Sequence, residues 1–252
     1  MSNNKLNNAP LKEVLLEIHW DLDFSSDEKI YIDKGFEQAA LNFTSACQQE
    51  FKEVELLKPE NMPPSAFIHR VTHRFFKVRG QHPLFQLGPG VFTINDNDKN
   101  YVWDEFKPMV INGIKCLNTS YNKPLVPSKV ELRYVDRVSP YVLGNEDKFQ
   151  FIKEHLSINP DHNGLLTEYL NLDQTNIRRS YNISEDKQLN LTILTGIDGQ
   201  SKEDVVEWHT FINNKKRLSW DNLPVWIEES HDICSDLFKK MVSKKLYEYF
   251  SS

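Results

Sequence analysis

The chain has 252 residues, of which 39% are hydrophobic and 12% aromatic, and its formal net charge is -6. This composition excludes a disordered chain, which would be poor in aromatic residues, and it argues against a domain devoted to nucleic acid, since such domains are usually basic. The three cysteines Cys47, Cys116 and Cys234 are far apart and form no CxxC pair or zinc-spaced cluster, which argues against a disulfide framework and a zinc site.

The first ten residues, MSNNKLNNAP, are polar and lack the apolar core of a secretion signal. The chain contains no run of about 18 apolar residues, the length that a transmembrane helix requires. Together with the sparse cysteines, these features predict a cytoplasmic protein without a membrane partner. Residues 1–9 are expected to form a disordered tail.

The first half is predicted to contain a strand, a helix, three strands and a second helix. Near-alternation of apolar residues over 11–20 predicts the first strand, and apolar positions three and four residues apart over 35–54 predict the first helix. The other expected elements are strands over 67–78, 84–87 and 91–94 and a helix over 101–117. Pro108 falls inside this helix and indicates either a kink or a later helix start.

The second half is predicted to repeat this order. The expected elements are a strand that begins at Val130, a short helix over 147–156, strands over 168–183, 189–195 and 205–212, and a long closing helix over 224–250. Glycine and asparagine residues at 196–199 and 213–214 supply the turns.

This order predicts an α+β fold: a mostly antiparallel sheet with helices on one face. The halves 10–124 and 125–252 are either duplicated β-α-β-β-β-α units or parts of one integrated domain. Val102-Trp103-Asp104-Glu105 and Val225-Trp226-Ile227-Glu228 open the two corresponding helices and favour duplication. The alternative is that α+β proteins look repetitive when only elements are counted. The groove between the halves is the expected surface for a ligand or a partner.

Four segments carry a resemblance to a known family: PLKEVLLEIHW, HPLFQLGPGVFTIN, YVWDEF and WIEESHDICSDLF. They resemble a sporadically distributed, uncharacterised family of bacterial proteins, over nearly the whole chain. The shared pattern is structural and transfers no catalytic or binding residue. A patchy distribution is typical of genes in bacterial conflict and defence systems, so the resemblance implies such a context without implying a mechanism.

Three histidines are close together in the segment FIHRVTHRFFKVRGQHP: His69, His73 and His82. In a strand over 67–78, His69 and His73 lie on the same face, where they are either metal ligands or ordinary strand residues. The segment between them offers no carboxylate and no HExxH motif. We therefore predict no metal site.

Six arginines on predicted strands are the candidate binding residues, since arginine with interleaved aromatics suits contacts to phosphate or nucleic acid. The alternative is a solvated sheet face on which arginines pair with carboxylates across strands. The six are Arg70, Arg74, Arg133, Arg137, Arg178 and Arg179.

The sequence contains no phosphate-binding loop, GxSxG motif or kinase motif, so no catalytic residue and no cofactor are assigned. His231 and Cys234 are three residues apart on one helix, a poor arrangement for a catalytic dyad. The sequence favours a non-enzymatic binding or adaptor protein with a protein partner, acting through a sheet face or the groove between the halves. The alternatives are a nucleic-acid or anion-binding protein that uses the arginines, and a hydrolase whose scattered site includes His69, His73 and Asp136.

Overall fold

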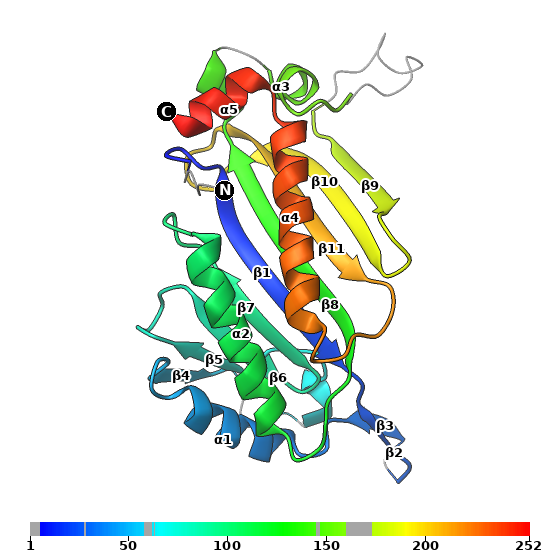
Figure 1. Cartoon of the computed structure of the whole chain (residues 1–252). Helices are drawn as coiled ribbons and strands as arrows, with labels where there is room; N and C mark the ends of the chain where they lie inside the picture. The colour runs from blue at the N-terminus through cyan, green and yellow to red at the C-terminus, as the bar shows by residue number, and fades with distance from the viewer. Residues whose placement is uncertain (1–5, 28, 58–61, 63, 145–146, 160–172) are drawn as a thin grey trace.

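A computed structural model of the chain describes residues 6–27, 29–57, 62, 64–144, 147–159 and 173–252. In these residues nine strands form one antiparallel sheet in the order β4-β5-β6-β7-β1-β8-β11-β10-β9 (Figure 1). The strands are β1 (Leu11–Trp20), β4 (Glu53–Leu56), β5 (His73–Phe76), β6 (Leu84–Gly88), β7 (Val91–Asp96), β8 (Pro127–Val138), β9 (Asn176–Asn182), β10 (Lys187–Ile197) and β11 (Asp204–Asn214).

Helices cover one face of this sheet (Figure 1). The helices α1, α2 and α4 lie across its middle and one end, and the short helices α3 and α5 lie at the other end. Their bounds are α1 (Phe36–Cys47), α2 (Trp103–Ser120), α3 (Lys148–His155), α4 (Leu223–Met241) and α5 (Lys244–Ser251). Two 3₁₀ turns, Pro64–Phe67 and Pro140–Leu143, and a small hairpin of β2 (Asp23–Ser25) and β3 (Ile30–Ile32) complete the described elements. The predicted α+β fold with a mostly antiparallel sheet is confirmed.

The alternation along β1 decides which face of the sheet is covered. Val14, Leu16 and Ile18 are fully buried under the helices, whereas Glu17 and His19 point to the opposite side. Successive side chains of a strand point to opposite faces, so an apolar-polar alternation produces one dry face and one polar face. We call the second side, which carries Glu17, the open face of the sheet.

The apolar core is divided into two clusters. The larger lies beneath α1, α2 and the first turns of α4 and includes Phe43, Phe85 and Trp226. The smaller lies beneath α3, α5 and the end of α4 and includes Phe151 and Trp208. Each cluster buries several aromatic rings, whose removal from water stabilises the fold.

The strand order has a regular relationship to the chain order. β1 and β8 pair at the centre of the sheet, and each is flanked by the last strand of its own half, β7 or β11. Outward from the centre, the order is then 7-6-5 on one side and 11-10-9 on the other, with β4 added at one edge. Both halves therefore have the same connectivity, and duplication itself stays a prediction.

Three predicted elements were wrong in extent. The first helix ends at Cys47, and residues 53–56 form edge strand β4, because they pair with β5. The strand expected over 67–78 is reduced to β5, because Pro64–Phe67 is a 3₁₀ turn and His69 has a φ of 54°. The closing helix breaks before α5, whose N-cap Ser243 accepts a hydrogen bond from the Leu246 amide.

The N-terminal segment also differs from expectation over its described part. Residues 6–9 belong to the expected disordered tail, but Leu6 packs against the smaller core cluster. The Asn8 amide donates a hydrogen bond to the Phe250 carbonyl, and the Asn7 side chain donates to the carbonyls of Ser251 and Ser252. This segment is therefore attached to α5. Of the strand expected over 168–183, residues 168–172 lie outside the described residues.

Candidate functional site

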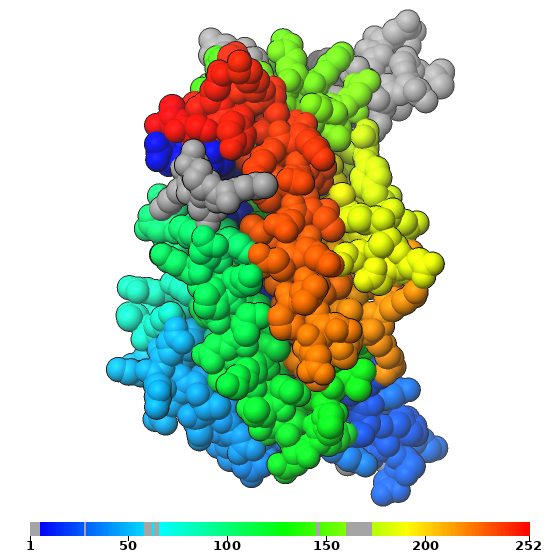
Figure 2. Space-filling model, viewed as in Figure 1, coloured from blue at the N-terminus to red at the C-terminus, as the bar shows by residue number. Residues whose placement is uncertain are grey.

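A pocket of about 420 Å³ lies between the N-terminal end of α2 and the middle of α4. The two helices lie over the sheet (Figure 1), and their side chains lie side by side on the surface (Figure 2). We call it the interhelical pocket. Its walls come from segments 98–103 and 231–239, its floor from β8 and β11, and residues 6–11 and Tyr247 close one side. Its lining includes Cys234, which belongs to the larger core cluster, and Tyr101, which packs against that cluster. It also includes Phe238 and Tyr247, which pack against the smaller cluster. The pocket therefore lies where the two clusters meet.

The floor of the pocket is made by polar residues of β8. Val130 and Leu132 are buried beneath the helices, and the next two positions on the same side of the strand are Tyr134 and Asp136. The register of β8 against β1 shifts opposite Asp136, between Leu11 and Glu13. Such a bulge changes the direction of the side chains near it. The apolar floor is thus replaced by a phenol and a carboxyl.

A chain of hydrogen bonds crosses the pocket from one helix to the other. The hydroxyl oxygens of Tyr101 and Tyr134 are 3.3 Å apart, and Tyr134 Oη is 2.7 Å from Nδ1 of His231. The ring of Trp103 stacks on the His231 ring, with centroids 3.9 Å apart and planes within 3°. Burial lowers the pKa of His231 to about 4, so the imidazole is neutral at pH 7. Its Nδ1 can then accept from Tyr134 or donate to it, depending on the tautomer.

Asp136 is the most unusual residue of the pocket. It is 6% exposed, and among the described residues its carboxyl forms no ion pair and has the indole of Trp208 as its hydrogen-bonding neighbour. Burial raises its pKa to about 7, and the indole of Trp208, directly opposite on β11, offsets part of that effect. Burial also raises the pKa of the Cys234 thiol. Buried carboxyls usually have a partner, and this one is accompanied by neutral groups.

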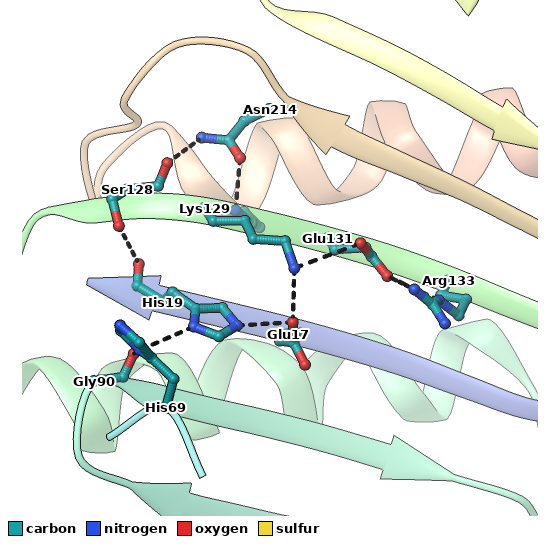
Figure 3. A network of polar contacts seen from close by, with 10 residues as sticks. Glu17, His19, His69, Gly90, Ser128, Lys129, Glu131, Arg133 and Asn214 are labelled. Atoms are coloured by element: carbon teal, nitrogen blue, oxygen red, sulfur yellow. Dashed lines mark hydrogen bonds and ion pairs between the residues drawn. The ribbon is translucent and has the colours of Figure 1, made fainter. Parts of the chain in front are cut away.

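The open face carries a second polar cluster (Figure 3). Glu17 Oε1 lies 2.8 Å from His19 Nε2 and 3.0 Å from Lys129 Nζ. Hydrogen bonds from His19 and Lys129 lower the pKa of Glu17 to about 2, against the opposing effect of burial. On the neighbouring strand, the buried Glu131 binds the Arg133 guanidinium. Each carboxylate in this cluster therefore has a cation or an imidazole beside it, as a structural charge network requires.

The structure separates the six candidate arginines. Cross-strand register places Arg74, Arg133, Arg137 and Arg178 on the open face and Arg179 on the opposite side of β9. Arg70 follows a 3₁₀ turn and is in no strand, so its expected place beside Arg74 on a strand was wrong.

Three of the arginines on the open face already bind carboxylates. Arg74 pairs with Glu55 at 3.5 Å, Arg133 pairs with Glu131, and Arg137 pairs with Glu207 at 2.5 Å. Arg178 and Arg179 are exposed on the edge strand and form no ion pair with the described residues. The pairs of Arg74 and Arg137 are cross-strand pairs, as in the alternative to an anion-binding surface, whereas Arg133 and Glu131 lie on the same strand.

The three histidines do not come together. His69 lies in a turn, where Nδ1 is 3.2 Å from His19 Nδ1 and 3.1 Å from the Gly90 carbonyl. His73 is on the helix-covered side, with its ring centroid 5.7 Å from that of Phe36. His82 Nδ1 is 3.4 Å from the Asn95 carbonyl. The described residues contain no group of three or more side chains suited to hold a metal ion. The three residues considered for a hydrolase site are also apart: His69 lies beside Gly90, His73 beside Phe36, and Asp136 in the interhelical pocket.

Sequence reasoning named Asp136 and His231 separately and did not bring them together with Tyr101 and Tyr134. One signal was present, because Tyr134 and Asp136 interrupt the apolar side of a strand that also carries Val130, Leu132 and Val138. The contacts of Tyr134 with Tyr101 and His231 have no signal in the local sequence, because the partners are 33 and 97 residues away along the chain.

No family model, no curated protein and no solved structure matches the chain. The resemblance to the sporadically distributed bacterial family therefore stays a prediction. Among the described helices, none is both long enough and apolar enough to cross a membrane.

Proposed function

We propose that this protein binds a small ligand in the interhelical pocket and acts as a binding protein, without a catalytic step. The observation that carries the proposal is the buried Asp136 carboxyl, which lines the pocket and, among the described residues, has the neutral indole of Trp208 beside it and no cation. A buried carboxyl of this kind is destabilising unless a partner satisfies it. A bound ligand supplies such a partner.

The size and lining of the pocket support the same proposal. Ligand sites in proteins are concave, mostly apolar and about 300–1,000 Å³ in volume, with a few polar groups that fix orientation. The interhelical pocket has about 420 Å³, aromatic walls and a small set of polar side chains. Residues of both predicted halves, 10–124 and 125–252, line it, as expected of a binding groove between them.

The chemistry of these side chains supports binding over catalysis. The Cys234 thiol has a raised pKa, so it is a poor nucleophile, and His231 is already engaged with Tyr134. A nucleophile activated by a neighbouring base is the usual sign of covalent catalysis. The described lining of the pocket contains no such pair.

The proposal is tested by blocking the pocket. Ser235 is a half-buried lining residue on α4, and Ser235→Trp places an indole in the cavity. Ser45→Trp, on the exposed surface of α1, is the matched control. Both variants and the parent are screened by protein-observed NMR against a fragment library of mixed charge. We expect fragments that shift the pocket resonances of the parent and of the control, and that are lost in Ser235→Trp. A library without any binder in the pocket contradicts the proposal.

A further inference from the structure

We infer that the ligand of the interhelical pocket is an organic cation with a flat or apolar body, whose N–H donors bind the Asp136 carboxylate. The inference rests on the proposed function and specifies its ligand class. Protonated amines, amidines and guanidines belong to this class. The geometry that supports it concerns the charge at the floor, the aromatic walls and the distribution of charge at the rim.

The floor presents a carboxyl that no cation among the described residues neutralises. The groups packed around Asp136 come from three elements: Tyr134 on its own strand, Trp208 and Thr210 on β11, and Cys234 on α4. All are uncharged, since burial raises the pKa values of the Tyr134 phenol and the Cys234 thiol. A buried charge is stabilised by a partner of opposite charge that also donates hydrogen bonds. A cation with N–H groups meets both requirements.

The cationic side chains of the pocket stand at its rim. Lys99 and Lys239 line the pocket, and both are exposed to solvent. Asp98 is exposed at the same rim and counters part of their charge. Among the described lining residues, a fixed positive charge is therefore kept away from Asp136. An anionic ligand would meet the Asp136 carboxyl at the floor, and like charges in a buried site repel strongly.

Aromatic rings surround the space above this carboxyl. Tyr101 and Tyr134 approach each other edge to face, with centroids 6.4 Å apart, and Trp103 stacks on His231. The faces of such rings attract a cation, with Trp and Tyr the strongest. The hydroxyl oxygens of Tyr101 and Tyr134 can accept further N–H hydrogen bonds, because each has two lone pairs. The walls and the floor therefore favour the same ligand chemistry.

The experiment compares three aromatic probes of nearly equal size and different charge: benzamidine, benzamide and benzoate. Binding to the parent protein is followed by NMR titration of the pocket resonances at pH 8, where Asp136 is mostly ionised. We expect benzamidine to bind at least about tenfold more tightly than benzamide, and benzoate to bind least. This comparison needs no variant, so it remains decisive where a substitution disturbs folding.

The carboxyl is then removed by Asp136→Asn, with Asp236→Asn, an exposed acid of α4 outside the pocket lining, as the matched control. We expect Asp136→Asn to weaken benzamidine at least about tenfold and to leave benzamide nearly unchanged. The exposed control is expected to change benzamidine affinity by less than about threefold, because surface charges are screened.

Each negative result contradicts a different claim: the ligand class, the role of Asp136, or the pocket as a ligand site. Benzamide or benzoate binding as tightly as benzamidine overturns the cation class and leaves the pocket as a ligand site. Benzamidine binding that is unchanged in Asp136→Asn overturns the role of this carboxyl. If none of the three probes binds in the pocket and the fragment screen with Ser235→Trp also finds no binder there, the proposed function fails together with this inference.

Discussion

Tyr134 Oη and His231 Nδ1 lie 2.7 Å apart, and this contact joins a central strand of the sheet to the middle of α4. The two residues are 97 positions apart in the chain. Because Tyr101 completes the chain from the side of α2, the same three side chains connect both helices through one strand. The walls of the interhelical pocket are therefore held at a defined separation by hydrogen bonds as well as by apolar packing.

Removing the central hydroxyl is expected to destabilise the fold. Tyr134→Phe leaves Nδ1 of His231 without its partner, and an unsatisfied buried polar group costs about 1–3 kcal/mol. Tyr101→Phe removes only the end of the chain and is the control, with an expected loss of about 1 kcal/mol or less. Urea unfolding of the two variants and of the double variant measures both effects and their coupling. Equal stabilities for Tyr134→Phe and the parent would contradict this role.

Replacing the buried carboxyl is expected to stabilise the protein at neutral and higher pH. The pKa of Asp136 is about 7 in the folded protein and near its ordinary value of 3.8 in the unfolded chain. The folded state therefore holds the proton longer, and the free energy of unfolding decreases as the pH rises from about 4 to about 7. Asp136→Asn removes this dependence and is expected to gain about 1–4 kcal/mol at pH 8.

The comparison is made by thermal and urea unfolding of both proteins at pH 4.5 and pH 8. A benefit of the same size at both pH values would show that the carboxyl charge is not its origin. The neutral neighbours Tyr134, Trp208 and Cys234 do not titrate in this interval and do not obscure the comparison.

Glu17 on the open face is expected to behave in the opposite way. Its folded pKa of about 2 is below the ordinary value of 4.5, so its contribution is present above pH 4.5 and is lost as the pH falls toward 2. Glu17→Gln is expected to cost about 1–2 kcal/mol at pH 7, since the side chain is partly exposed to solvent and the charge is screened. Glu53→Gln, an exposed residue of edge strand β4, is the control. A loss that persists at pH 2 would assign the effect to packing.

The end of strand β6 is expected to tolerate no side chain at Gly88. A Cβ at this position would lie 1.9 Å from the backbone carbonyl oxygen of Arg70, so the segment beyond the 3₁₀ turn would have to move. Gly88→Ala is expected to cost about 3 kcal/mol or more, as overpacking does. Gly196→Ala on β10 is the control, because a Cβ there meets nothing within 4 Å. Circular dichroism during urea unfolding measures both, and a neutral Gly88→Ala would exclude the close approach.

The fold follows from sequence patterns wherever one local signal is sufficient. The alternation that ends in Trp20 predicts β1 correctly, and the i, i+3, i+4 spacing that includes Phe106 and Val110 predicts α2. The errors occur where tertiary contacts decide. Residues 53–56 continue an apolar helical pattern and form a strand, because the edge of β5 is available to them. His69 has no local sign of a positive φ, and its ring is held against Gly90.

The candidate site could be predicted only in part. A binding groove between the halves was expected and stays a prediction, and the interhelical pocket is lined by residues of both predicted halves. Its polar residues were not recognised as one group, since the sequence analysis places Asp136 with His69 and His73 and considers His231 only beside Cys234. The burial that raises the pKa of Asp136 depends on residues from three different elements. A single sequence does not display which of its distant residues meet.

The attachment of residues 6–9 to α5 has a consequence for the order in which the molecule is completed during synthesis. Leu6, Pro10 and Leu11 line the interhelical pocket, and so does Tyr247 near the other end of the described chain. Domains emerge from the ribosome in chain order. Residues 6–9 must therefore wait for α5 before the hydrogen bonds of Asn7 and Asn8 can form. A nascent chain stalled before residue 243 is expected to have most of its sheet and an incomplete pocket.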